Sequence, residues 1–207
     1  MDSYILGKSD SDIILIQMVD ERDLEGLEKE FNLIEKNIDK SFSMLAFKVE
    51  DWNRDISPWK AEPVFGNVGF GGEAEKTLSE VIGFCSDKSK KYYIGGYSLA
   101  GLFALWASYQ TDIFQGVAAA SPSVWFPGFD SYVLSHQILT DKVYLSLGDK
   151  EERTRNPVMA MVGEKIRSYH RYLNDNGIMT TLEWNAGGHF CDAELRTAKA
   201  FSWVLKD

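Results

Sequence analysis

Cysteine, proline and histidine are scarce in this sequence. Its 207 residues include 5 prolines, 3 histidines and 2 cysteines, Cys85 and Cys191. Two cysteines allow one disulfide at most. Because the N-terminus shows no basic and apolar leader, we expect two free thiols in a cytoplasmic protein. No apolar run reaches the roughly 18 residues that a membrane span needs, so we expect no membrane partner.

Basic residues are also few. Lys and Arg total 22 against 31 Asp and Glu, which gives a net charge of -9. An acidic surface repels nucleic acid, and no basic run offsets it, so a nucleic-acid partner is not expected. The hydrophobic fraction of 44% and the charged fraction of 26% are those of an ordinary globular chain. The length predicts a single domain over residues 1–207.

Short apolar stretches alternate with stretches of helical periodicity. This alternation predicts the α/β class, with a mostly parallel central sheet and helices on both faces. The irregular stretch 50–71 is long enough to suggest a functional loop. At 6–9 the first glycine of a phosphate-binding loop is missing and no strand is expected before it. We expect strands at 12–19, 43–49, 91–97, 116–120, 143–147 and 180–184, and helices at 24–38, 72–85, 99–109, 157–174 and 193–205.

The sharpest motif joins the strand at 91–97 to the helix that follows it. Gly96-Tyr97-Ser98-Leu99-Ala100 matches the nucleophile-elbow pattern Gly-x-Ser-x-Gly, with alanine in the last position. Such a serine stands on a sharp turn, and the residues two before and two after must be small because strand and helix approach closely. Ser98 is therefore the candidate nucleophile, and the Leu99 N–H is a candidate oxyanion donor.

A serine nucleophile needs a general base, and three histidines compete for that role. His136 lies in a helix or loop without a motif, and His170 lies among charged residues of a helix. His189 follows the last strand in the segment Gly187-Gly188-His189, where two glycines let the loop bend back. It is also the last histidine of the chain, as the order Ser, acid, His requires, so His189 is the predicted base.

The acid is expected after the strand that lies between Ser98 and His189. Asp149, Glu151 and Glu152 compete there, and Asp and Glu both orient an imidazole. We favour Glu151, because the acid commonly falls three residues after the glycine that ends the strand, and keep the other two as alternatives.

The remaining parts of the site have weaker signals. A second oxyanion donor is expected after the strand at 43–49, with the backbone N–H of Trp52 preferred and that of Asn53 second. Tyr97, Trp125 and Phe126 are candidate substrate-binding residues near the nucleophile. The cysteines lack metal-ligand spacing, so neither a metal nor another cofactor is expected.

These motifs resemble the esterase branch of the α/β-hydrolase superfamily, which holds siderophore-ester hydrolases, S-formylglutathione hydrolases and feruloyl esterases. The resemblance runs from about Ser43 to the C-terminus and includes the segments 95–103, 120–125, 147–151 and 187–190. It implies an α/β-hydrolase fold and an acyl-enzyme on Ser98, with His189 and Glu151 completing the triad. The chain is short, so a minimal form without a cap domain is expected.

The sequence thus predicts a serine esterase that acts on a small-molecule ester. Acyl transfer to another alcohol by the same triad is an alternative, and a catalytically silent binding protein of the same fold is another. Because α/β sheets often pair through an edge strand or helix, a homodimer is also an expectation.

Overall fold

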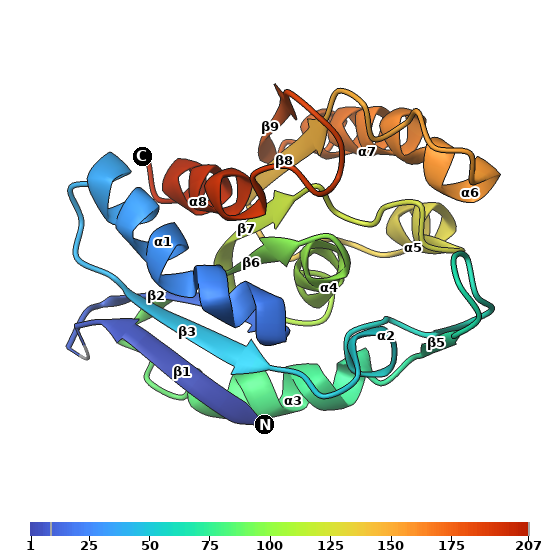
Figure 1. Cartoon of the computed structure of the whole chain (residues 1–207). Coiled ribbons are helices and arrows are strands. Elements are labelled where there is room, and N and C mark those ends of the chain that lie inside the picture. Colours follow the sequence, from blue (N-terminus) through green and yellow to red (C-terminus); the bar gives the residue numbers. More distant parts are fainter. Residues whose placement is uncertain (9, 207) are drawn as a thin grey trace.

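The computed structural model describes residues 1–8 and 10–206, and Ser9 and Asp207 lie outside the described residues (Figure 1). A seven-stranded mixed sheet forms its centre. Six of the strands run parallel, and β1 pairs antiparallel with β3 at one edge. In spatial order the strands are β1 (Asp2–Gly7), β3 (Ser43–Lys48), β2 (Ile13–Val19), β6 (Lys91–Tyr97), β7 (Phe114–Ala120), β8 (Lys142–Gly148) and β9 (Met179–Asn185).

Helices cover both faces of this sheet, and each face has its own hydrophobic core. On one face α1 (Glu21–Asn37) and α8 (Ala193–Val204) lie side by side, as Figure 1 shows. Residues of α3 (Ala74–Phe84), α4 (Leu99–Ala107) and α7 (Val162–Asp175) build the other core. The predicted α/β class, with helices on both faces, is confirmed.

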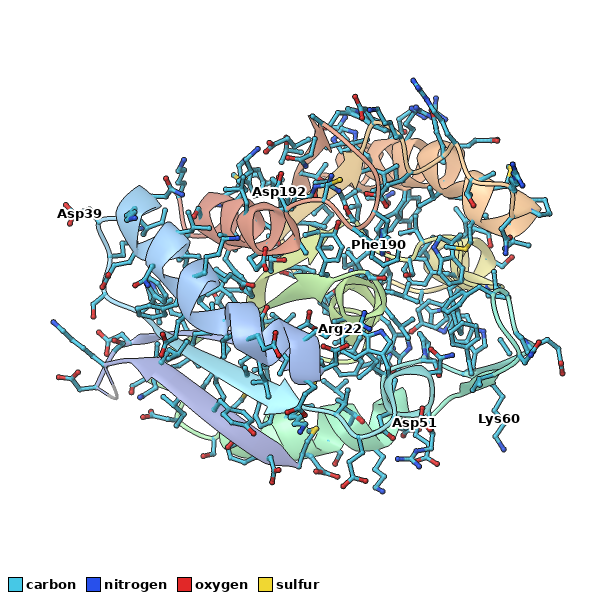
Figure 2. All side chains as sticks on the ribbon, in the orientation of Figure 1. Arg22, Asp39, Asp51, Lys60, Phe190 and Asp192 are labelled. Carbon is cyan, nitrogen blue, oxygen red and sulfur yellow. The ribbon has the colours of Figure 1, made fainter. Side chains whose placement is uncertain are left out.

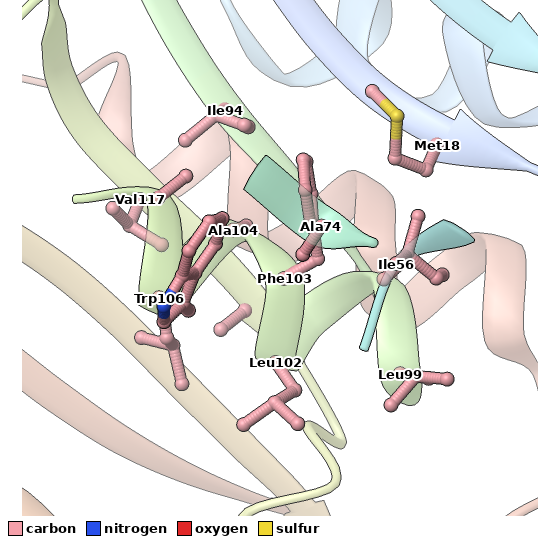
Figure 3. Close-up of a cluster of buried hydrophobic side chains, with 14 of the residues drawn as sticks. Met18, Ile56, Ala74, Ile94, Leu99, Leu102, Phe103, Ala104, Trp106 and Val117 are labelled. Atoms are coloured by element: carbon pink, nitrogen blue, oxygen red, sulfur yellow. The ribbon is translucent and has the colours of Figure 1, made fainter. Parts of the chain in front are cut away.

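The helix that follows the candidate nucleophile is fully enclosed. All nine residues of α4 are buried, and its sequence is apolar on every side, as expected for a helix without a solvent-facing stripe. Figure 3 shows Leu102 and Phe103 of α4 in a cluster with Ile94 of β6 and Val117 of β7. A helix packed on all sides gives the turn at its N-terminus a rigid support.

The strand β1 was not predicted, and it corrects the statement that no strand precedes residues 6–9. Five of its six residues are exposed, so the stretch has no buried apolar run to mark it. Its position at the sheet edge explains this exposure. The antiparallel pairing with β3 makes this stretch a strand, which its residue pattern does not reveal.

The helix expected at 157–174 is two helices, α6 (Pro157–Ala160) and α7, with Met161 between them. The sequence analysis also did not assign α5 (Phe129–Ser135). Within the described residues no helix is both long and apolar enough to cross a membrane.

The stretch 50–71 is ordered as a small excursion from the sheet. It contains α2 (Trp52–Asp55) and a two-stranded ribbon of β4 (Lys60–Ala61) and β5 (Phe70–Gly71). Trp59 anchors it, since its Nε1 donates to the carbonyl of Pro127 at 2.9 Å. In Figure 1 this ribbon extends towards α5. The excursion is therefore tied to the loop that follows β7.

Candidate active site

The candidate site lies where the parallel strands end. Ser98 follows β6, Ser121 follows β7, Glu151 follows β8 and His189 follows β9. Carboxyl ends of neighbouring parallel strands meet at one edge of a sheet, and ligand sites of open α/β sheets form there. The topology therefore brings these four side chains together although 91 residues separate the first from the last.

Ser98 occupies the turn that the motif predicts. Its φ of 57° and ψ of -120° depart from the ordinary helical and extended regions, so this non-glycine residue holds a strained backbone. The strain is retained because β6 and α4 fix both sides of the turn. A Cβ added to Gly96 would lie 2.7 Å from the Cβ of Ala100, which shows why both positions must be small.

His189 meets Ser98 from the loop between β9 and α8. The Nε2 atom of His189 lies 2.9 Å from the Oγ atom of Ser98. The loop is held in place by the N–H of Gly187, which donates to Asp149 Oδ1 at 2.8 Å. Gly187 has a φ of 97°, a region that glycine enters without a Cβ penalty. The base expected from the sequence thus lies within hydrogen-bond reach of the expected nucleophile.

Glu151 completes the chain of hydrogen bonds. Its Oε2 atom lies 2.6 Å from His189 Nδ1, while its Oε1 atom accepts from the Gly148 N–H at 2.7 Å and from Ser121 Oγ at 2.8 Å. Burial acts to raise the pKa of Glu151, but its contacts with His189 and these two donors outweigh burial and lower it. The carboxylate is therefore held ionised beside the imidazole.

The two competing acids have other partners. Asp149 holds Gly187, as described above, and Glu152 forms a surface ion pair with Arg167 at 3.2 Å. Of the three carboxylates after β8, the structure places Glu151 against His189.

Arg196 is a central residue of the site that the sequence analysis missed. It lies on α8 with only 1% of its surface exposed. Its Nη1 atom lies 2.9 Å from Glu151 Oε1 and 3.0 Å from the hydroxyl of Tyr97, and its Nη2 atom donates to the carbonyls of Ala186 and Gly188 at 3.0 Å each. One guanidinium thus ties the acid to the loop that carries the base. The sequence signal that could have identified Arg196 is a basic residue on the inward side of an amphipathic helix.

Tyr97, which the sequence analysis expected to contact substrate, has a supporting position in the site. Its hydroxyl donates to the carbonyl of His189 at 2.6 Å and accepts from Arg196. Burial raises the pKa of Tyr97 to about 12, so the phenol keeps its proton. Its hydrogen bonds are used to hold the His189 loop.

The other two predicted substrate-binding residues lie in the core. Phe126 has no exposed surface and Trp125 has 6%, because both side chains pack into the cluster that includes Phe70. Phe126 is therefore a core residue, which corrects the expectation. Phe190, directly after His189, is instead 95% exposed (Figure 2). Sequence position near a nucleophile did not distinguish a buried aromatic side chain from an exposed one.

The two candidate oxyanion donors differ in their support. Leu99 begins α4 directly after Ser98, as expected. Trp52 follows β3, but the strand beside β6 is β2, and the chain leaves β2 through Asp20 into α1. The sequence analysis tied the second donor to the strand at 43–49 without the spatial order of the strands, which the structure supplies.

Two histidines lie apart from this arrangement. The exposed ring of His136, directly after α5, stacks on Tyr132, and His170 lies on α7. Among the described residues, no group of three or more His, Cys, Asp or Glu side chains has the geometry to hold a metal ion.

Comparison with known proteins gives likeness in structure only. No protein-family model matches the sequence, and no curated protein sequence matches it. An IroE-like serine hydrolase from Shewanella oneidensis superposes with a TM-score of 0.76 at 12% identity, over 97% of this chain and 74% of that one.

Two further solved structures are similar at lower scores. A carboxylesterase from Bacillus cereus has a TM-score of 0.62 at 15% identity, over 99% of this chain and 93% of that one. The enterobactin esterase FES from Shigella flexneri has a TM-score of 0.63 at 10% identity, over 98% of this chain and 54% of that one. With the sheet order and the turn at Ser98, these likenesses show that the chain has the α/β-hydrolase fold.

Proposed function

We propose that this protein is a serine esterase that hydrolyses carboxylic esters through an acyl-enzyme on Ser98. The observation that supports it best is the hydrogen-bonded chain from Ser98 Oγ through His189 to Glu151, with distances of 2.9 and 2.6 Å. The neighbours in fold that are named esterases and serine hydrolases agree with this function.

In the acylation step His189 Nε2 accepts the proton of the Ser98 hydroxyl while Oγ attacks the ester carbonyl. Glu151 keeps the proton of His189 on Nδ1 and stabilises the imidazolium that forms. Collapse of the tetrahedral intermediate breaks the bond to the alkoxy group, and His189 returns its proton to the leaving alcohol. A water molecule then attacks the acyl group with His189 as base, which releases the carboxylic acid and restores Ser98.

The negative oxygen of each tetrahedral intermediate requires two donors. Leu99 supplies one N–H at the positive end of α4. We place the second in the segment after β2. The N–H groups of Asp20 and Arg22 are bonded to the carboxylates of Asp23 and Asp20. The N–H of Glu21 is the one among these three with no hydrogen bond within the described residues.

Between β7 and β8 the structure describes only the short helix α5, which leaves no room there for a cap domain, so we propose small or solvent-accessible esters as substrates. Acyl transfer to an alcohol other than water uses the same residues and differs only in the acceptor. The strained turn at Ser98 favours an enzyme over a silent binding protein, since a binding module gains nothing from that strain.

The test uses a fluorophosphonate probe and short p-nitrophenyl esters. We expect the wild-type protein to be labelled and to release p-nitrophenol, and Ser98→Ala to lose both. Ser123→Ala is the matched control, because its Oγ lies 3.3 Å from that of Ser98 but makes no contact with His189 within the described residues. Labelling of Ser98→Ala at the wild-type rate would exclude Ser98 as nucleophile. Absence of labelling in the folded wild type would favour the binding protein.

A further inference from the structure

The most exposed large apolar side chain of the described residues stands beside the candidate base. Phe190 follows His189 directly and is 95% exposed, whereas the other exposed large apolar residues reach 71% at most. It lies on the loop between β9 and α8, where Figure 2 labels it, and belongs to neither hydrophobic core. An aromatic side chain that packs into a protein buries about 150–250 Å². The fold gains almost none of this burial from Phe190, so packing does not explain a phenylalanine at this position.

The ring of Phe190 has one aromatic neighbour within the described residues, the imidazole of His189. The two ring centroids are 5.3 Å apart and the ring planes meet at 83°, an edge-to-face contact. The ring of Tyr97 is the other aromatic neighbour of the imidazole, at 5.2 Å, but its hydroxyl is tied into the supporting hydrogen bonds of the site. Phe190 is therefore the apolar surface that a molecule arriving from solvent meets next to the base.

Hydrogen bonds fix the backbone that carries this ring. The carbonyl of His189 accepts from the Tyr97 hydroxyl at 2.6 Å. The N–H of Cys191 donates to the carbonyl of Gly188 at 3.3 Å, which closes a turn across Phe190. The helix α8 begins two residues after this turn. Because the attachment point of the ring is held in place, a ligand that packs on it has little backbone to order on binding.

The acyl-enzyme route determines which half of an ester lies beside His189. The imidazole returns its proton to the oxygen of the leaving alcohol, so this oxygen must come within hydrogen-bond distance of Nε2. The carbonyl oxygen points instead to its backbone donors, of which the Leu99 N–H is one. The acyl chain takes the remaining direction at the reacting carbon. The alcohol part of the ester is therefore the part that extends past the imidazole towards Phe190.

We propose that Phe190 is a specificity-determining residue that binds the alcohol part of the substrate, and that the preferred substrates are esters of alcohols that carry an aromatic ring. Resting on the proposed esterase function, this role names the substrate class of the same site. A ring on the alcohol packs edge-to-face or offset on Phe190, the geometries that aromatic pairs favour, and both rings lose contact with water. A methyl group on the alcohol is too small to cover the ring.

The experiment measures kcat/KM of the full chain for three esters by titration of the released acid. Benzyl acetate and methyl acetate share the acyl group and differ in the alcohol, whereas methyl phenylacetate has its ring on the acyl side. We expect Phe190→Ala to lower the ratio of kcat/KM for benzyl acetate to that for methyl acetate about tenfold. The loss is expected mainly in KM, because the apolar contact is present in the ground state and the transition state alike. The ratio of methyl phenylacetate to methyl acetate should not change.

Two further variants serve as controls. Phe84→Ala removes an exposed phenylalanine at the end of α3, where its ring packs on Phe47, and should keep both ratios of the wild type. Phe190→Leu keeps apolar surface without the ring and should recover part of the preference for benzyl acetate. Phe190→Ala is expected to unfold at the urea concentration of the wild type, because the side chain is almost fully exposed.

Three results would overturn the role of Phe190. An equal loss of kcat/KM for all three esters in Phe190→Ala, together with a shifted acid limb of the pH profile, would mean that the ring acts on His189 and not on the substrate. A loss confined to methyl phenylacetate would place the ring on the acyl side. Unchanged ratios would mean that no substrate group reaches it. Hydrolysis of methyl acetate that is lost in Ser98→Ala tests the proposed function by itself, whereas only the ratios between esters test Phe190.

Discussion

The guanidinium of Arg196 lies 2.9 Å from Glu151 Oε1, and the other oxygen of the same carboxylate faces His189 at 2.6 Å. The side chains of Arg196 and Glu151 are 2% and 5% exposed, so this is a buried ion pair. Its second function is mechanical, because Arg196 Nη2 also holds the loop that carries His189 through two carbonyls. The acid and the base are therefore positioned by one side chain.

Arg196→Met tests this positioning. The change leaves a buried carboxylate and the hydroxyls of Tyr97 and Ser121 without their shared donor, and we expect it to lower the free energy of unfolding by about 3–5 kcal/mol. We also expect the acid limb of the kcat profile to move to higher pH, since Glu151 loses a cationic neighbour. Urea denaturation and pH-rate profiles measure the two effects.

Arg167→Met is the control, because Arg167 pairs with Glu152 on the surface and such pairs contribute about 1 kcal/mol or less. Unfolding of Arg196→Met at the urea concentration of the wild type would contradict the structural assignment.

The three acids after β8 are separable by amide substitution. Glu151→Gln removes the negative charge beside His189 and is expected to lower kcat about 10⁴-fold with little effect on KM. Asp149→Asn weakens the bond to the Gly187 N–H, so we expect a smaller loss of kcat together with lower stability. Glu152→Gln breaks a surface ion pair and is expected to leave kcat unchanged. A full loss of kcat in Glu152→Gln with normal kcat in Glu151→Gln would overturn this order.

The local parts of the site could be predicted from sequence because they depend on short-range rules. The elbow at Ser98 needs small neighbours on both sides, and these are visible as Gly96 and Ala100. The order of nucleophile, acid and base along the chain then pointed to His189 and to the three carboxylates Asp149, Glu151 and Glu152, of which Glu151 was favoured for its spacing from Gly148. Glu151 lies three residues after β8, which is buried along nearly all its length, and His189 lies four residues after β9.

The spatial order of the strands was not available from the sequence. Trp52 was preferred as a donor because it follows the strand at 43–49, whereas β2 is the strand that pairs with β6. Phe126 was preferred because it was expected on a loop near the proposed site, but its side chain packs into the core. Arg196 was missed because its partners come from four separate segments, and no local pattern reveals such a contact.

The second oxyanion donor is testable with proline, which removes a backbone N–H. Glu21 and Trp52 are each the first residue of a helix, where proline is tolerated, and the residue before each is extended. We expect Glu21→Pro to lower kcat about 10²–10³-fold, and Trp52→Pro to have a far smaller effect. Glu21→Ala and Trp52→Ala correct for the lost side chains, including the ion pair of Glu21 with Lys48. The reverse ranking of the two proline variants would restore Trp52 as the donor.

The buried carboxyl of Glu30 predicts a pH-dependent stability. The pKa of Glu30 in the folded state is raised above its ordinary value of about 4.3 in the unfolded chain. At a pH between these two pKa values, the native state holds one more proton than the unfolded chain. The free energy of unfolding therefore falls as pH rises through this window. Glu30→Gln cannot titrate, so we expect it to match the wild type near pH 4.5 and to exceed it by about 1–3 kcal/mol at pH 8.

Urea denaturation in phosphate buffer measures this difference. Part of the slope should remain in Glu30→Gln below pH 6, because burial raises the pKa of Asp23 to about 6. Glu28→Gln makes the same substitution on the exposed side of α1 and should follow the wild type in its pH dependence. A Glu30→Gln curve parallel to the wild type across the whole range would mean that Glu30 is ionised in the folded protein, with a cationic partner already in place.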